Sequence, residues 1–322
     1  MINVQNLRKS YGDTVAVDNL SMTIADNHIY GFLGPNGAGK TTTLNIITGC
    51  LAADAGEVVI DGYDILRAPR EAKRRIGYLP EQPPLYDDMT PAEFLTFVGD
   101  AKGLRGSVLR SSVDAAMEKT DIADVRRRLI RHLSKGYRQR VGIAQAILGE
   151  PSTVILDEPT VGLDPIQVSE VRSLIRELGQ AHTVIFSSHI LSEVSALCDR
   201  VLIISQGRLM AEDTPENLSA CAPGIHRITI TVRGEPSHAL DALKKLSNVS
   251  ASIISGDGGE TQLRLESRAD VREQVSAALA SAGVPLLGMM LDMATLEDVF
   301  LELTRGESSG NNGKEAGNAV DL

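Results

Sequence analysis

The sequence contains no apolar stretch of the roughly 18–20 residues that a helix needs to cross a bilayer. It also begins without the charged, apolar and small-residue segments of a secretory leader. Its three cysteines, Cys50, Cys198 and Cys221, show no metal-binding or redox spacing, and they suit packed free thiols in a reducing compartment. These absences predict a cytosolic chain, unless another chain holds it at a membrane.

Excess positive charge is missing too, because the formal net charge is −10 over 322 residues. Phosphate contacts supply most of the nonspecific affinity for nucleic acid, so we expect no nucleic-acid partner. Two local basic clusters do occur, at residues 73–75 and 126–131. They are either solvated faces or contacts with a partner or the membrane surface.

A glycine-rich segment follows the apolar run at residues 29–33, which we expect to be a buried strand. The segment fits the pattern of glycine, four residues, glycine, lysine and threonine that binds nucleoside triphosphates. Its glycines let backbone N–H groups approach phosphate oxygens, and the following helix directs its positive end at them. Lys40 is placed to reach the β and γ phosphates, and the Thr41 hydroxyl to ligate Mg²⁺. The predicted phosphate-binding residues are Gly34, Pro35, Asn36, Gly37, Ala38, Gly39, Lys40, Thr41 and Thr42.

Two adjacent carboxylates, Asp157 and Glu158, follow a second strand-like apolar run. Asp157 would end its strand beside the phosphate loop, where it can hold Mg²⁺ directly or through water. Glu158 is placed to accept a proton from the attacking water, or to orient it. Taken alone, the pair could simply be two acids at the start of a loop. No Asn-Lys-x-Asp guanine-reading motif occurs, which argues against a GTPase.

The segment Leu-Ser-Lys-Gly-Tyr at residues 133–137 lies between these two motifs. Here the chain resembles the ATP-binding subunits of ABC transporters, whose signature is Leu-Ser-Gly-Gly-Gln. The resemblance covers about residues 1–220 and keeps the family's order of motifs. It implies a P-loop ATPase that binds and hydrolyses ATP with Mg²⁺, with Lys40, Glu158 and His189 as the catalytic side chains.

The resemblance also implies further nucleotide contacts. Tyr11 matches the aromatic residue that stacks on adenine, and Ser134 and Gly136 match the signature groups that meet phosphate. Asp164 matches the D-loop, and His189 the switch histidine that contacts the γ-phosphate. Structural roles remain open for several of them: Asp164 and Ser134 as helix N-caps, His189 as a hydrogen-bonded strand end and Tyr11 as ordinary packing.

Two positions depart from the commonest family pattern. Lys135 replaces a signature glycine and adds positive charge, and we expect the signature to remain functional. Glu81 stands where the family has the glutamine of its Q-loop, with Gln82 one place later, so either can contact the nucleotide. Both variations resemble the branch that serves ABC-2-type exporters, including gliding-motility and multidrug-type systems.

The hydrophobic pattern predicts how the cassette folds. Strands at 153–157, 183–187 and 200–204 alternate with helices, which predicts an α/β core with a parallel sheet. Short β segments within 1–33 and 57–63, with Asp61-Gly62 as a strong hairpin signal, predict an antiparallel β subdomain. The pattern of residues 84–150 predicts a helical insert. In the family this insert touches the membrane subunit.

A second unit is predicted from 221 to 305. Its order of strands and helices, starting at strand 226–232 and ending at strand 286–291, is the βαββαβ unit of a small ferredoxin-like α+β domain. A closing helix follows at 295–304. Regulation, dimer support and inert packing stay open as its role, and we expect the Gly-, Asn- and Ser-rich tail at 306–322 to be disordered.

The chain holds one phosphate loop and one signature. In the family the signature of one subunit completes the nucleotide site of another, so a single copy implies a homodimer or pairing with a related chain. The resemblance therefore predicts a peripheral subunit at the cytoplasmic face of the membrane, where ATP-driven dimer closure powers a separate ABC-2-type permease, in the direction of export. The alternative is a soluble ABC ATPase that acts on nucleic acid or the ribosome.

Overall fold

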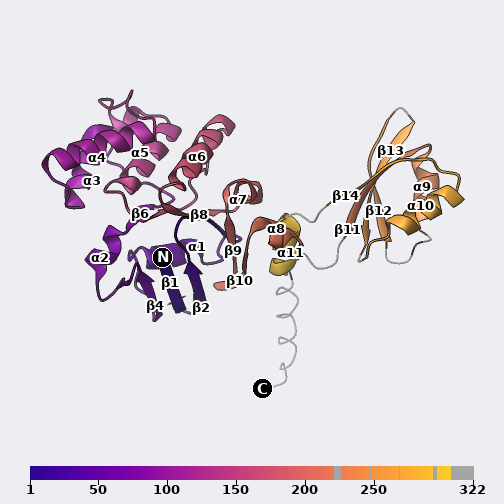
Figure 1. Ribbon diagram of the computed structural model, residues 1–322, viewed down its shortest axis with the longest axis horizontal. Helices are drawn as coiled ribbons and strands as arrows, with labels where there is room; N and C mark the ends of the chain where they lie inside the picture. Colours follow the sequence, from indigo (N-terminus) through magenta and orange to yellow (C-terminus); the bar gives the residue numbers. More distant parts are fainter. Residues whose placement is uncertain are drawn as a thin grey trace, which may run out of the picture. The chain divides into compact units, whose positions relative to one another are not determined.

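The computed structural model describes residues 1–220, 226–244, 246, 249–257, 259–267, 269–292 and 296–305. Its internal contacts divide the chain into two compact units, Met1–Pro215 and Glu216–Leu322 (Figure 1). Within the described ranges, no helix is long and apolar enough to cross a membrane.

A six-stranded sheet forms the centre of the first unit, in the order β10-β9-β3-β8-β7-β6. The pairs from β9 to β6 are parallel, and only β10 joins antiparallel, at the edge. Every residue of β3, β7 and β8 is buried, as expected for parallel strands that are covered on both faces. The strands are β3 (Ile29–Leu33), β6 (Ile76–Leu79), β7 (Thr153–Leu156), β8 (Thr183–Ser188), β9 (Arg200–Ser205) and β10 (Arg208–Asp213).

A four-stranded antiparallel sheet accompanies it, in the order β2-β1-β4-β5. Its members are β1 (Ile2–Tyr11), β2 (Thr14–Ile24), β4 (Ala55–Ile60) and β5 (Tyr63–Asp64). The β4–β5 hairpin turns at Asp61 and Gly62, whose φ angles of 49° and 85° confirm the predicted hairpin signal.

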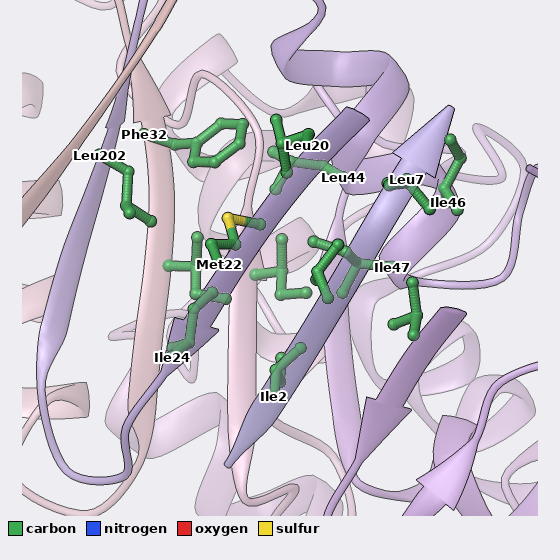
Figure 2. Packing of buried hydrophobic residues seen from close by; sticks show 14 of the residues in the cluster. Ile2, Leu7, Leu20, Met22, Ile24, Phe32, Leu44, Ile46, Ile47 and Leu202 are labelled. Carbon is green, nitrogen blue, oxygen red and sulfur yellow. The ribbon is translucent and has the colours of Figure 1, made fainter. Parts of the chain in front are cut away.

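One apolar core joins the two sheets to helix α1 (Lys40–Ile47). Ile24 comes from β2, Phe32 from β3 and Leu44 from α1, and all three are fully buried (Figure 2). Because α1 begins directly after the glycine-rich loop, this packing fixes the loop at the end of β3. The core therefore holds the predicted phosphate loop in place.

Helices between β6 and β7 form the predicted helical insert: α3 (Pro91–Ala101), α4 (Gly106–Lys119), a 3-10 turn at Ile130–His132 and α5 (Lys135–Ile147). Thr90 and Glu93 make a capping box at the start of α3, with both reciprocal hydrogen bonds present. The ammonium of Lys102 donates hydrogen bonds to the last carbonyls of α5 and to the residue after it, at 3.0 Å (Gln145), 3.2 Å (Ala146) and 3.0 Å (Leu148). The other helices of this unit are α2 (Pro69–Arg74), α6 (Pro165–Leu178) and α7 (Leu191–Leu197).

The second unit contains an antiparallel sheet in the order β12-β13-β11-β14. Ile230 and Leu265 on this sheet and Leu243 and Leu279 on α9 and α10 belong to one buried cluster. Its elements are β11 (His226–Arg233), α9 (Pro236–Leu243), β12 (Val249–Asp257), β13 (Glu260–Ser267), α10 (Arg272–Ser281) and β14 (Leu286–Asp292). Along the chain, α8 (Pro215–Ala220) precedes them and α11 (Leu296–Arg305) follows them.

This order confirms the predicted ferredoxin-like βαββαβ unit. The first unit has the predicted P-loop core with an antiparallel subdomain and a helical insert. The expectation of a disordered tail at 306–322 lies outside the described residues.

Candidate nucleotide site

The glycine-rich loop bends sharply between β3 and α1. Gly37 and Gly39 have φ angles of 81° and 98°, in the left-handed region that favours glycine. A Cβ on Gly39 would lie 2.3 Å from the carbonyl oxygen of Ala16, so no larger residue fits there. The structure leaves Pro35, Asn36 and Thr41 exposed at this loop.

Lys40 is the first residue of α1, and its side chain folds back over the loop. The ammonium donates hydrogen bonds to the carbonyl oxygens of Gly34 at 2.7 Å and Pro35 at 3.2 Å. Burial lowers the pKa of Lys40, and the negative charges of Glu158, Asp157 and Glu81 oppose that shift without cancelling it. Three carboxylates that the sequence assigns to the nucleotide site therefore act electrostatically on Lys40, the lysine expected to bind phosphate.

Asp157 lies directly after β7 and is fully buried. The Ser187 hydroxyl, at the end of neighbouring β8, donates to Asp157 Oδ1 at 2.5 Å and accepts the backbone N–H of Glu158 at 2.8 Å. Within the described residues, Asp157 Oδ2 has no hydrogen-bond partner. A buried carboxylate oxygen left without a donor fits a divalent cation or a water bound to one.

Glu158 has a φ angle of 48°, which is uncommon for a residue with a long side chain. Its Oε2 lies 2.9 Å from Nδ1 of His189, the residue that follows β8. Glu158 is 9% exposed, whereas the side chain of His189 is 48% exposed. The carboxylate is thus held inside the protein, and the imidazole borders the solvent.

No hydrogen bond of the described chain joins the predicted adenine-stacking, signature and D-loop residues, or Gln82, to the cluster of Lys40, Asp157, Glu158 and His189. Tyr11 is 52% exposed at the end of β1, with Lys9 Nζ 5.8 Å from its ring centre. Ser134 and Asp164 cap α5 and α6 by accepting backbone N–H groups at 3.4 and 2.9 Å. Gly136 packs against Gln167, and Gln82 is exposed.

Lys135, the unusual signature residue, lies against the loop that contains Asp164. A Cβ on Gly162 would come within 2.1 Å of Lys135 Nζ, and the φ angle of this glycine is 68°. The lysine that replaces a signature glycine therefore occupies the space beside Gly162 of its own chain.

The sequence motifs assigned a role to His189 but none to Ser187, two residues before it. The parallel register pairs Leu156 with Phe186, so the next residues, Asp157 and Ser187, are brought side by side. A small hydroxyl residue at the carboxyl end of a neighbouring strand was the available signal.

Comparison with known proteins places this geometry in a family. The family described as "ABC transporter" matches residues 17–161. The chain is 32% identical to the linearmycin resistance ATP-binding protein LnrL of Bacillus subtilis (strain 168), over 94% of this chain and 98% of that protein. It is 34% identical to the Nod factor export ATP-binding protein I of Paraburkholderia xenovorans (strain LB400), over 95% and 97% respectively.

Among solved structures, a bacterial ABC transporter cassette in dimeric form is similar with a TM-score of 0.61 and 25% identity, over 66% of this chain and 98% of that one. These likenesses confirm the resemblance and the fold predicted from the sequence, and they support transport over a soluble nucleic-acid or ribosomal role. The chain belongs to the ATP-binding, ATP-hydrolysing subunits of the ABC transporter family.

Proposed function

We propose that this subunit powers export through a separate ABC-2-type integral membrane permease at the cytoplasmic face of the membrane. Similarity to one protein named for linearmycin resistance and to another named for Nod factor export supports the direction of transport. The observation that carries the chemistry is the 2.9 Å contact between Glu158 and His189 beside Asp157 and Lys40. In our proposal residues 1–220 are the ATP-binding domain and residues 221–305 an accessory domain that regulates the cassette or supports its dimer.

In this proposal the residues of the site have different roles during ATP hydrolysis. The backbone N–H groups of the loop and Lys40 hold the β and γ phosphates of ATP, and to do so Lys40 leaves the carbonyl oxygens of Gly34 and Pro35. Glu158 accepts the proton of the attacking water, and His189 hydrogen-bonds the γ-phosphate while it stays aligned by Glu158. Mg²⁺, when bound, would offset the phosphate charge, and Asp157 with the Thr41 hydroxyl would hold it.

Glu81 is the better candidate of the two Q-loop residues. Both side chains are exposed, but the charge of Glu81 opposes the lowering of the Lys40 pKa, so Glu81 lies near enough to act on the phosphate loop. We propose that Glu81 contacts a water or Mg²⁺ beside the γ-phosphate.

A second subunit completes the site in this proposal. The single signature, at Ser134 and Gly136, is outside the hydrogen-bonded cluster around Lys40 and meets the nucleotide of a partner cassette instead. The similar cassette with a dimeric structure supports such an arrangement. Either a second copy of this chain or a related chain fits, with Tyr11 stacking on the adenine and Asp164 facing the partner.

An aromatic cluster in the helical insert is the surface that we propose for the permease. Tyr86 and Phe97 are each 49% exposed, and the ring centre of Tyr86 lies 5.6 Å from that of Phe97 and 6.0 Å from that of buried Phe94. Aromatic residues make up only 3% of this chain, so two exposed rings in contact, anchored on a buried third, form a concentrated apolar surface.

Mild-detergent purification of the tagged chain from its own cells tests the proposal. An integral membrane protein should co-purify with the wild type, and Phe97→Ser should lose it while keeping ATP hydrolysis. Val108→Ser, which changes an apolar residue 60% exposed on neighbouring α4, should retain the partner and serves as the matched control. Recovery of only ribosomal, DNA-bound or soluble partners would contradict the export role.

A further inference from the structure

A buried carboxylate on α7 is not used by the chemistry described so far. Glu193 is 1% exposed. Its Oε2 accepts hydrogen bonds from the hydroxyls of Thr160 at 2.8 Å and Ser188 at 3.1 Å, and its Oε1 lies 3.4 Å from a guanidinium nitrogen of Arg172. Four segments of the chain therefore meet at one side chain.

These partners flank the two catalytic candidates. Thr160 stands two residues after Glu158, in the loop that follows β7. Ser188 ends β8 immediately before His189, and its hydroxyl also accepts the backbone N–H of Ile190 at 3.0 Å. One carboxylate oxygen thus connects the loop of the proposed base to the loop of the proposed switch histidine.

The energetics argue against a purely space-filling role. Removing a carboxylate from water is costly unless several donors satisfy it, and an apolar side chain would fill the same position without that cost. The strained φ angle of 48° at Glu158 also needs surrounding contacts to hold it. Thr160 and Ser188, 4% and 0% exposed, supply such contacts from both loops.

We propose that Glu193 is a positioning residue for ATP hydrolysis, which holds the Glu158 loop and the His189 loop in register through Thr160 and Ser188. This inference rests on the proposed roles of Glu158 and His189. The phosphate loop lies between β3 and α1, and Lys40 begins α1. No hydrogen bond of the described residues joins them to Glu193, so ATP binding should be insensitive to this network.

Steady-state ATP hydrolysis by the purified full-length chain tests the proposal. Glu193→Ala removes the acceptor of two buried hydroxyls and the ion-pair partner of Arg172, and it risks unfolding. The informative variants are therefore Thr160→Val and Ser188→Ala. Each should lower kcat about 10- to 100-fold, the scale of a misplacement near 1 Å, while KM for ATP stays within about twofold. The double variant should be no slower than the slower single variant, because both hydroxyls act through one oxygen.

Two matched changes separate positioning from packing. Thr120→Val removes another buried threonine hydroxyl, 1% exposed, which donates to the Ala116 carbonyl at 2.8 Å at the end of α4, and it should leave kcat unchanged. Thr160→Ser keeps the hydroxyl and should restore kcat. If Thr160→Val and Ser188→Ala match Thr120→Val in kcat, Glu193 only packs, and the proposal is overturned.

Glu158→Gln, measured in the same assay, separates a failure of the proposed catalytic roles from a failure of the proposed positioning role of Glu193. Full hydrolysis by Glu158→Gln would overturn the proposed catalytic roles themselves. Loss of hydrolysis in Glu158→Gln, together with unchanged kcat in Thr160→Val and Ser188→Ala, would leave those roles intact and overturn the role of Glu193 alone.

Discussion

Replacing Lys102 should change how the stability of the protein depends on pH. The ammonium of Lys102 donates to three carbonyl groups at the end of α5, the helix that starts with the signature. Burial lowers the pKa of Lys102 to about 8, from the ordinary value of 10.5. Lys102→Met keeps most of the aliphatic volume and removes the titrating group.

The direction of this pH dependence follows from the number of protons that Lys102 binds in the folded and unfolded chain. Between pH 8 and 10.5 the unfolded chain holds a proton on Lys102 that the folded chain has lost, so the free energy of unfolding rises with pH in this window. The difference of about 2.5 pH units corresponds to about 3 kcal/mol. Because the side chain is partly exposed, we expect about half of that value. Below about pH 8 both states carry the charge, and the contribution is constant.

Urea denaturation of wild type and Lys102→Met at pH 7.5 and pH 10 measures the effect. The stability of the wild type relative to the variant should increase by about 1.5 kcal/mol at the higher pH. Lys119→Met, at an exposed lysine that ends α4, should show no such increase and controls for the other groups that titrate. A relative stability that stays constant or falls at pH 10 would refute the reasoning.

Three further changes have distinct expected outcomes. Asp157→Asn removes a buried charge whose Oδ2 has no hydrogen-bond partner among the described residues. The thermal midpoint without ligand should therefore stay or rise, while kcat falls at least about 100-fold. A lower midpoint with hydrolysis retained would contradict this. Gly39→Ala places a Cβ 2.3 Å from the Ala16 carbonyl oxygen at a φ angle of 98°. It should lower the free energy of unfolding by about 2 kcal/mol or more and abolish nucleotide binding in a fluorescence titration. Wild-type affinity would argue against the loop geometry. Thr90→Ala breaks the capping box of α3 and should cost about 1 kcal/mol of stability with unchanged hydrolysis, and an unchanged urea midpoint would show that the cap contributes nothing.

Local sequence patterns predicted most of the fold, because many of its strands, turns and helix ends are marked by residues that are adjacent or a few positions apart. Continuous apolar runs identified buried parallel strands such as Thr153–Leu156, and the Asp61–Gly62 dipeptide identified a hairpin. Thr90 and Glu93 are three residues apart, so their capping box was also visible in the sequence. In the second unit, residues 262–266 alternate polar and apolar, which is typical of a strand with one covered face, and the structure buries every second position of β13 over most of its length.

Contacts between distant segments could not be predicted in the same way. Glu193 meets Thr160 and Ser188 only because β7 and β8 are neighbours in the sheet, and strand order is not encoded in any short motif. The three carbonyl acceptors of Lys102 likewise depend on how α3 packs near the end of α5. The position of Lys135 against Gly162 is a third contact of this kind, formed between two loops.

ATP turnover by Glu158→Gln tests the central claim most directly. The amide keeps the shape of the side chain and removes the proton acceptor, so we predict at least about a 100-fold loss of kcat with ATP binding preserved and an ATP-bound dimer that persists in gel filtration. Hydrolysis at the wild-type rate would contradict the assignment of Glu158 as the residue that activates water.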